Sequence, residues 1–212
     1  MEKKYKLTEE TIIVDGRTLH RIEALKDFAN VKKGEKGGFI ENENNLTQYG
    51  KCWVYDNAEV SGYAMVHNNA TVSGNAKVSG NAMIHEDAKV YGDAKVCGDA
   101  MVFGNARVYG DAKICGDAMV YGDAKVYDKA IVCGDAMVYD YAEVYGSAEV
   151  FSKAKVFDNA EVFGNAEVYD DAKVFEDARI YGNAKICGDA KVYGKAEFSD
   201  NTIVHGDAVV CG

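Results

Sequence analysis

From Val54 to Val210 an aliphatic residue recurs at every sixth position, with Phe198 as the only aromatic substitute. Alanine follows four positions after each of these residues, except at Thr202. The consensus is V-(Y/F/C/S)-G-(D/N)-A-x, repeated 27 times. A period of six fits neither an α-helix nor a heptad coiled coil, but it is a multiple of the two-residue period of a strand. The pattern therefore predicts short strands, each followed by a corner.

Side-chain alternation assigns a role to each position of the repeat. Within A-x-V-Y, alanine and valine point to one side of the strand, whereas x and tyrosine point to the other. Glycine occupies the first corner position in 17 of 27 repeats, and asparagine or aspartate the second in 20 of 26. These residue types tolerate the left-handed backbone region that tight corners use. We expect a Val/Ala interior and corners in which both positions turn the chain.

The spacing of rarer residues predicts how many repeats make one coil. After Met1 every methionine is followed by the next exactly three repeats later, and the same holds for Cys97, Cys115 and Cys133. His67 and His85 are also separated by three repeats. Three repeats per coil would stack each set in a column. The sequence therefore predicts an all-β protein, a triangular parallel β-helix of about nine coils.

The repeat array resembles the hexapeptide-repeat proteins that form a left-handed parallel β-helix. Residues 16–22 (GRTLHRI), 24–28 (ALKDF) and 37–41 (GGFIE) resemble the start of YdcK-like bacterial and phage proteins. The left hand of the helix and a phage or prophage origin are what this resemblance implies. Proteins of this kind often carry an acyltransferase label that rests on their fold alone.

The first 46 residues lack the repeat and are interpreted as an N-terminal β cap, followed by the β-helix over 47–212. Asp15-Gly16 lies between two apolar-rich runs, which predicts a β-hairpin. A solenoid end exposes strand edges and core, so it requires a cap. The spacing of Ile40, Leu46 and Val54 predicts an irregular first coil with two extra residues.

At the other end the sequence stops within a repeat, at Cys211-Gly212. A last coil of this kind would present open strand edges and apolar side chains. We therefore expect Val204, Val210 and Cys211 to form a tip through which the protein could self-associate.

Composition narrows the class of protein further. The chain has no proline, and its four leucines all precede residue 47, which argues against a helix bundle or a doubly wound α/β fold. The net charge of −10 falls entirely on residues 47–212, where 19 of 25 acidic residues lie at corners. This acidity argues against a basic nucleic-acid binder and against a polybasic membrane anchor. A minor alternative remains, in which the acidic corners mimic nucleic acid and inhibit a DNA-binding protein.

No apolar run is long enough to cross a membrane, and the start MEKKYKLTEE lacks the apolar core of a signal peptide. We therefore expect a cytoplasmic protein without a membrane partner. In that compartment six cysteines are expected to be reduced thiols.

One outward face is the main candidate for function. Exposed methionines beside aromatic rings would give a flat apolar patch, and methionine suits an adaptable binding surface. This pattern predicts an interface with a protein partner or with further copies of the chain, although duplication of repeats would leave the same columns without a function. The predicted interface residues are Met65, Met83, Met101, Met119, Met137, Phe103, Tyr121 and Tyr139.

The other two faces have simpler interpretations. A ladder that runs from Tyr91 to Tyr181 would stabilise the sheet surface or stack on a carbohydrate. Cys97, Cys115, Cys133 and Cys187 form a thiol column with no nearby imidazole, so we expect small surface residues rather than a metal site. The aspartates at the neighbouring corner are expected to be solvated. We predict no metal and no cofactor.

Acyltransferases that resemble this fold place a catalytic histidine between subunits, so His67 or His85 in a trimer is the alternative catalytic site. A general base needs a positioning partner and a pocket, and a flat face supplies neither. The γ-class carbonic anhydrases resemble the fold too, but they need three histidines around zinc, and the four histidines here are scattered. We therefore predict a rigid, non-catalytic scaffold that binds a protein or self-assembles.

Overall fold

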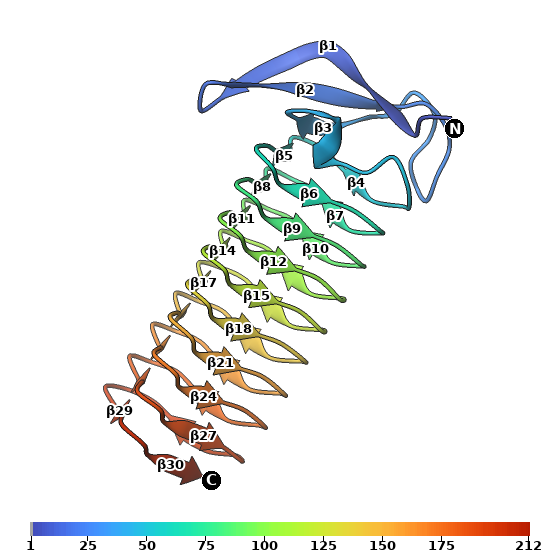
Figure 1. The fold of residues 1–212 in the computed structure, drawn as a ribbon. Helices are drawn as coiled ribbons and strands as arrows, with labels where there is room; N and C mark the ends of the chain where they lie inside the picture. Colours follow the sequence, from blue (N-terminus) through green and yellow to red (C-terminus); the bar gives the residue numbers. More distant parts are fainter. Residues whose placement is uncertain (1) are drawn as a thin grey trace.

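The computed structural model describes residues 2–212 and shows a long rod with a cap at one end (Figure 1). A hairpin of β1 (Tyr5–Val14) and β2 (Arg17–Ala24) lies across the end of the rod. It is followed by β3 (Lys36–Ile40) and the short 3-10 helix η1 (Glu43–Asn45). Twenty-seven short strands, β4 to β30, then wind around the axis. The prediction of an all-β solenoid is confirmed.

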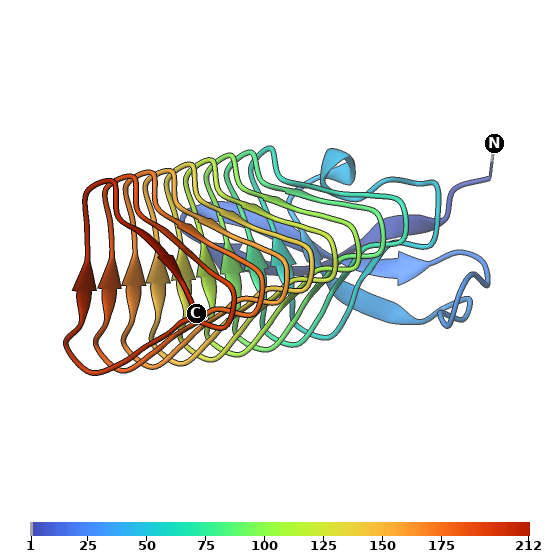
Figure 2. The same ribbon diagram turned by 90° about the horizontal axis from the view of Figure 1, so that it is seen from below.

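The strands form three sheets, one on each side of the triangular rod, and Figure 2 shows the successive coils stacked along it. The first, named the Cys sheet for its column of thiols, has the order β1-β2-β3-β5-β8-β11-β14-β17-β20-β23-β26-β29. Its repeat strands are β5 (Glu59–Val60), β8 (Lys77–Val78), β11 (Lys95–Val96), β14 (Lys113–Ile114), β17 (Ile131–Val132), β20 (Glu149–Val150), β23 (Glu167–Val168), β26 (Lys185–Ile186) and β29 (Ile203–Val204).

The other two sheets have nine strands each. The Met sheet consists of β6 (Met65–Val66), β9 (Met83–Ile84), β12 (Met101–Val102), β15 (Met119–Val120), β18 (Met137–Val138), β21 (Lys155–Val156), β24 (Lys173–Val174), β27 (Lys191–Tyr193) and β30 (Val209–Cys211). The Tyr sheet consists of β4 (Trp53–Val54), β7 (Thr71–Val72), β10 (Lys89–Val90), β13 (Arg107–Val108), β16 (Lys125–Val126), β19 (Glu143–Val144), β22 (Glu161–Val162), β25 (Arg179–Ile180) and β28 (Glu197–Phe198).

The strand register confirms three repeats per coil. Within the array each strand pairs in parallel with the strand three repeats further on, as Met101 does with Met119. The first coil is irregular, as expected, because Ile40 pairs with Val60 and Leu46 with Val66, so that each pair spans two residues more than a regular coil. The two additional residues lie in the loop before β4, which contains Cys52.

The interior consists of the small residues that the repeat predicts. Valine and alanine of the repeat are almost completely buried along the rod, up to a more open last coil. The larger interior position takes β-branched valine or isoleucine almost throughout, in keeping with their preference for strands, and leucine is absent from the array. The largest buried side chains lie at the cap end, where Tyr5, Ile22, Leu46 and Trp53 close the core.

The first and second corner positions of the repeat differ in backbone conformation. Every first corner position from residue 56 to residue 206 has positive φ, whether or not it is glycine. Six of the acidic residues there accept a hydrogen bond from the backbone N–H of the next coil, as Asp56 does from Gly74 at 2.9 Å. The six are Asp56, Glu86, Asp128, Asp158, Asp170 and Glu176.

The expectation for the second corner position is wrong in one respect. Among residues 2–212 no residue at this position has positive φ. Asparagine and aspartate there bond to each other along the corner, as Asn75 Nδ2 does to Asp93 Oδ1 at 3.0 Å. Six side-chain hydrogen bonds of this kind join neighbouring coils, so they account for part of this preference, and left-handed backbone does not.

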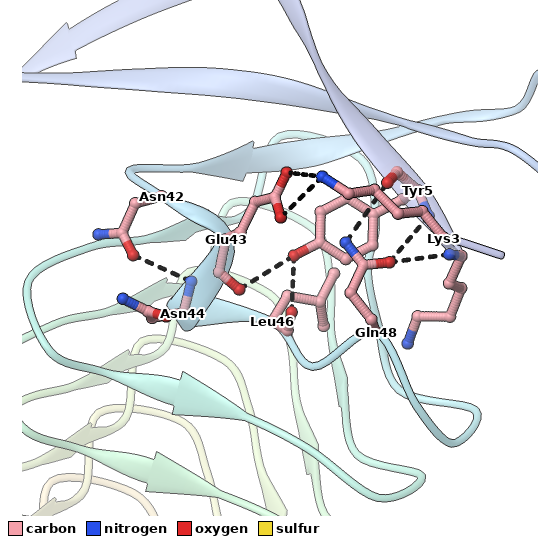
Figure 3. A network of polar contacts seen from close by, with 8 residues as sticks. Lys3, Tyr5, Asn42, Glu43, Asn44, Leu46 and Gln48 are labelled. Atoms are coloured by element: carbon pink, nitrogen blue, oxygen red, sulfur yellow. Dashed lines mark hydrogen bonds and ion pairs between the residues drawn. The ribbon is translucent and has the colours of Figure 1, made fainter. Parts of the chain in front are cut away.

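The cap hairpin turns at Asp15 (φ 49°) and Gly16 (φ 75°), which confirms the predicted turn. The cap is joined to the first coil by polar contacts, of which the bond from Tyr5 to Leu46 is buried (Figure 3). The Tyr5 hydroxyl donates to the Leu46 carbonyl oxygen at 2.6 Å, and Gln48 Oε1 accepts from the backbone N–H of Lys4 at 2.8 Å. We call the contacts of Lys4 and Tyr5 with residues 43–53 the cap junction.

Candidate functional site

The five predicted interface methionines share one column on the outer surface of the Met sheet. Met65, Met83, Met101, Met119 and Met137 begin β6, β9, β12, β15 and β18, and each pairs with the next. Only Met65 is clearly exposed, at 42%, whereas the other four are half-buried. The structure therefore brings the column together but exposes less apolar surface than the sequence led us to expect.

A ladder of stacked rings runs beside the methionines. Ring centroids are 4.8–5.0 Å apart and the ring planes are nearly parallel, as between Phe103 and Tyr121 (4.8 Å, 2°). This spacing equals the distance between adjacent strands, so the backbone imposes the stacking. The ladder consists of His67, His85, Phe103, Tyr121, Tyr139, Phe157, Phe175 and Tyr193.

The Met sheet changes character halfway along the rod. Met137 pairs with Lys155, and from there lysines replace the methionines at Lys155, Lys173 and Lys191. A shallow groove follows this edge, lined also by corner residues such as Asp171. None of the three amines lies within 4.0 Å of a carboxylate in residues 2–212. The first strand position on this face is therefore methionine over five coils and lysine over the next three, beside a corner that carries Asp135, Asp171 and Asp189.

The two candidate catalytic histidines end the ladder at the cap. The rings of His67 and His85 stack at 5.0 Å, and His67 borders a hollow of about 520 Å³. The hollow is lined by Glu43, Asn44, Thr47, Gln48, Tyr49, Met65, Val66 and His67.

The polar contacts of these histidines do not orient either ring as a general base would require. His67 Nδ1 lies 3.1 Å from the amide oxygen of Asn68, whereas His85 Nδ1 is 3.9 Å from Glu86 Oε1. Burial, together with the adjacent His67, lowers the pKa of His85 below its ordinary value. Neither histidine has a carboxylate at hydrogen-bond distance in the described chain. This geometry suits stacking better than proton transfer.

Three exposed tyrosines near the Met sheet were not singled out from the sequence. Tyr49, Tyr63 and Tyr141 are 64%, 83% and 65% exposed. Tyr63 and Tyr141 occupy second corner positions, where the consensus is asparagine or aspartate. Their departure from the consensus was the signal that could have identified them. Tyr63 comes two residues before Met65, so it lies at the corner where the chain enters the Met sheet.

The Tyr sheet carries a second ladder, whose contacts indicate a structural role. Its rings stack at 4.8–5.1 Å. The Tyr145 hydroxyl donates to Glu161 at 3.0 Å, and burial with this contact raises the pKa of Tyr145 to about 12. Lys125 Nζ and Glu143 Oε1 are 2.7 Å apart. The rings are Tyr91, Tyr109, Tyr127, Tyr145, Phe163 and Tyr181.

The Cys sheet holds the four aligned thiols, all half-buried and unbridged. Burial raises the pKa of the Cys97 and Cys115 thiols, which makes them poor ligands and poor nucleophiles. No group of three His, Cys, Asp or Glu side chains in residues 2–212 is arranged to hold a metal ion. No helix in that range is long and apolar enough to cross a membrane.

The predicted self-association tip lies in the last coil. Val204 in β29 is 8% exposed, Val210 in β30 is half-buried, and Cys211 is exposed.

Comparison with known proteins supports the repeat assignment. The sequence model of the YdcK β-solenoid repeat matches residues 94–110 and 112–128. An Escherichia coli (strain K12) protein, described as an uncharacterized acetyltransferase YdcK, is 38% identical over 81 residues. The matched segment covers 34% of this chain and 25% of that protein. The repeat array is thus similar to the YdcK β-solenoid repeat, and the chain spans only a quarter of the relative it matches.

Proposed function

We propose that this YdcK-like protein is a rigid, non-catalytic scaffold that binds a protein partner through the outer surface of the Met sheet. The observation that carries the proposal is the continuous column from Met65 to Met137 beside a ladder of eight stacked rings. Methionine side chains adapt to a partner's shape, whereas stacked aromatic rings give a fixed, flat contact area.

The rod supports such a role because its surface is preorganised. Backbone hydrogen bonds join each coil to the next along all three sheets, as from Met101 N–H to the Ala118 carbonyl oxygen at 2.9 Å. The ladder rings are fixed by the same strand spacing. A partner therefore meets a surface whose ordering entropy has already been lost during folding, and this favours binding.

The two halves of the face define the chemistry of the partner. The methionine half offers apolar contact, and Lys155, Lys173 and Lys191 offer three amines that have no carboxylate oxygen within 4.0 Å among residues 2–212. A complementary surface carries apolar side chains followed by carboxylates. Self-assembly through this face, or through the tip at Val204, Val210 and Cys211, remains a separate outcome that the experiment below distinguishes.

The test compares two doubly substituted proteins. Met101→Asp with Met119→Asp places two charges in the middle of the methionine column. Lys95→Gln with Lys113→Gln changes the net charge by the same amount, at the equivalent strand position on the Cys sheet. Each protein is immobilised for capture of partners, and its mass in solution is measured by light scattering.

We expect the methionine variant to lose a captured partner that both the wild type and the lysine variant retain. A wild-type oligomer that dissociates only in the methionine variant would assign the face to self-assembly. If all three proteins capture the same partners and have the same mass, the proposal fails.

Acyl transfer is the second candidate, favoured by the hollow beside His67 and by the description of the E. coli relative as an uncharacterized acetyltransferase. In this alternative a trimer would complete the hollow, and His67 or His85 would act as the base. Turnover of acetyl-CoA with a panel of amine acceptors, abolished by His67→Ala or His85→Ala but not by His205→Ala, would support it. Absence of turnover in a trimeric preparation would count against it.

A further inference from the structure

One lysine lies fully inside the cap junction. Lys4 has 1% of its surface exposed and Cys52 has none. Lys4 Nζ lies 3.2 Å from Cys52 Sγ and 2.9 Å from the Cys52 carbonyl oxygen, with the Tyr49 carbonyl oxygen at 3.3 Å. The ring of Phe28 closes another side, with its centroid 5.2 Å from the same nitrogen. An amine and a thiol are therefore held side by side, away from water.

No carboxylate balances this amine. Among residues 2–212 Lys4 has no Asp or Glu oxygen within 4.0 Å, whereas its neighbours Lys3 and Lys6 each form an ion pair. An unpaired buried ammonium is unfavourable. Burial lowers the pKa of the Lys4 amine and raises the pKa of the Cys52 thiol, so both shifts favour the uncharged pair. An uncharged amine retains the nitrogen lone pair that makes it a nucleophile.

We propose that Lys4 and Cys52 are a covalent modification site, at which dioxygen joins the two side chains through an N–O–S bridge. In this reaction R–SH, R′–NH₂ and O₂ give R–S–O–NH–R′ and H₂O. The S–H bond, one N–H bond and the O–O bond break, whereas one S–O bond, one O–N bond and water form. Sulfur and nitrogen each lose two electrons, and dioxygen takes up all four.

The geometry is specific to this pair. The gap of 3.2 Å between Nζ and Sγ is one that a single oxygen atom can bridge after a small side-chain adjustment. In the described chain no other cysteine sulfur has a lysine Nζ at hydrogen-bonding distance. Capture of a Cys52 sulfenic acid by the amine would instead form an S–N bond with loss of water, so the N–O–S bridge is a separate product that its mass distinguishes.

The bridge would link residue 4 to residue 52, and so tie the cap to the first coil. Such a link restricts the unfolded chain in the way that a disulfide does, and thereby stabilises the folded cap. A thiol reductant would reopen it. The cap junction thus becomes a redox-dependent attachment of the hairpin to the rod.

The test uses the full chain with Cys52 as its only cysteine, the other five being replaced by serine. The protein is kept in air-saturated buffer or in anaerobic buffer, and its intact mass is measured. The bridge adds one oxygen and removes two hydrogens, a gain of about 14 Da, whereas a sulfenic acid adds about 16 Da. We expect the smaller gain only with dioxygen, its reversal by dithiothreitol, and one peptide that contains both Lys4 and Cys52.

Lys4→Arg in the same background is the matched control, because it keeps a long basic side chain but has no primary amine. It should show no such gain of mass. The proposal is overturned if the Cys52-only protein, folded by circular dichroism, never gains this mass, or if the arginine variant gains it equally. If the Cys52-only protein does not fold, the wild-type protein is oxidised, alkylated and mapped by peptide mass spectrometry instead. The bridge is refuted if the Cys52 peptide is alkylated, or if it carries oxygen without being linked to the Lys4 peptide.

Discussion

The cap junction and the repeat array achieve stability in opposite ways. The junction depends on a few large, unlike side chains, with Trp53 edge-on to both Tyr5 and Phe28 at 6.0 and 5.3 Å. The array depends on many small, equivalent valines and alanines, each in contact with the coils on either side. One region is a unique arrangement that a single change can disrupt, whereas the other is a sum of nearly identical interfaces. Substitutions should therefore be costly in the junction and modest in the array.

The largest effect is expected at Trp53. Trp53→Ala removes a completely buried ring and should lower the free energy of unfolding by about 3–5 kcal/mol. Val120→Ala, in the middle of the array, removes two buried methyl groups and should cost about 2 kcal/mol. Urea unfolding followed by far-UV circular dichroism measures both. Equal losses of unfolding free energy would show that a buried side chain contributes no more in the junction than in a coil of the array.

The corners should give a smaller effect. Gly116 has φ of +70°, and a Cβ there would lie 2.9 Å from the backbone nitrogen of Gly134. Gly116→Ala should therefore cost about 1–2 kcal/mol. Gly116→Asp should cost about 1 kcal/mol less, because its carboxylate can accept from the Gly134 N–H as Asp56 does from Gly74. Thermal unfolding of both variants measures this difference. If the aspartate variant is no more stable than the alanine variant, the corner acids do not stabilise the rod through these hydrogen bonds.

The end of the ladder should make stability depend on pH. Because the pKa of His85 is lowered in the folded state by burial and by His67, the unfolded chain binds the proton more readily. Stability is therefore complete above the ordinary value of about 6.5 and declines as the pH falls through it. Melting temperatures at pH 7.5 and 5.5 should differ less in His85→Phe, which continues the stack from Phe103. An unchanged difference would exclude His85 as the cause.

The smallest effect is expected from the surface ion pairs between coils. Lys185 Nζ lies 2.9 and 3.0 Å from the two oxygens of Glu167, but both side chains are partly exposed. Lys185→Gln should cost less than about 1 kcal/mol, and added salt should reduce that cost. Lys191→Gln is the matched control, since Lys191 has no such partner in the described chain. If Lys185→Gln costs clearly more than about 1 kcal/mol, the ion pairs between coils contribute more to stability than exposed, solvent-screened pairs are expected to.

Much of the candidate site followed from the sequence, because strict periodicity fixes neighbours. Once three repeats make a coil, Met101 must lie between Met83 and Met119, and the rings must stack. The half-burial of Met83 to Met137 did not follow, because exposure depends on the neighbouring side chains rather than on strand position. The hollow beside His67 did not follow either, because it is formed by η1 and the loop before β4, two segments that lie outside the repeat.

The sequence by itself determined the array: its strands, its three sheets, its Val/Ala interior and the columns on each face. It could do so because every pairing between coils of the array joins residues three repeats apart. Only the tertiary structure decided the cap junction, where Lys4 meets Cys52 and Tyr5 meets Leu46. These partners are far apart in the chain and follow no period, so their pairing depends on how the hairpin lies across the first coil.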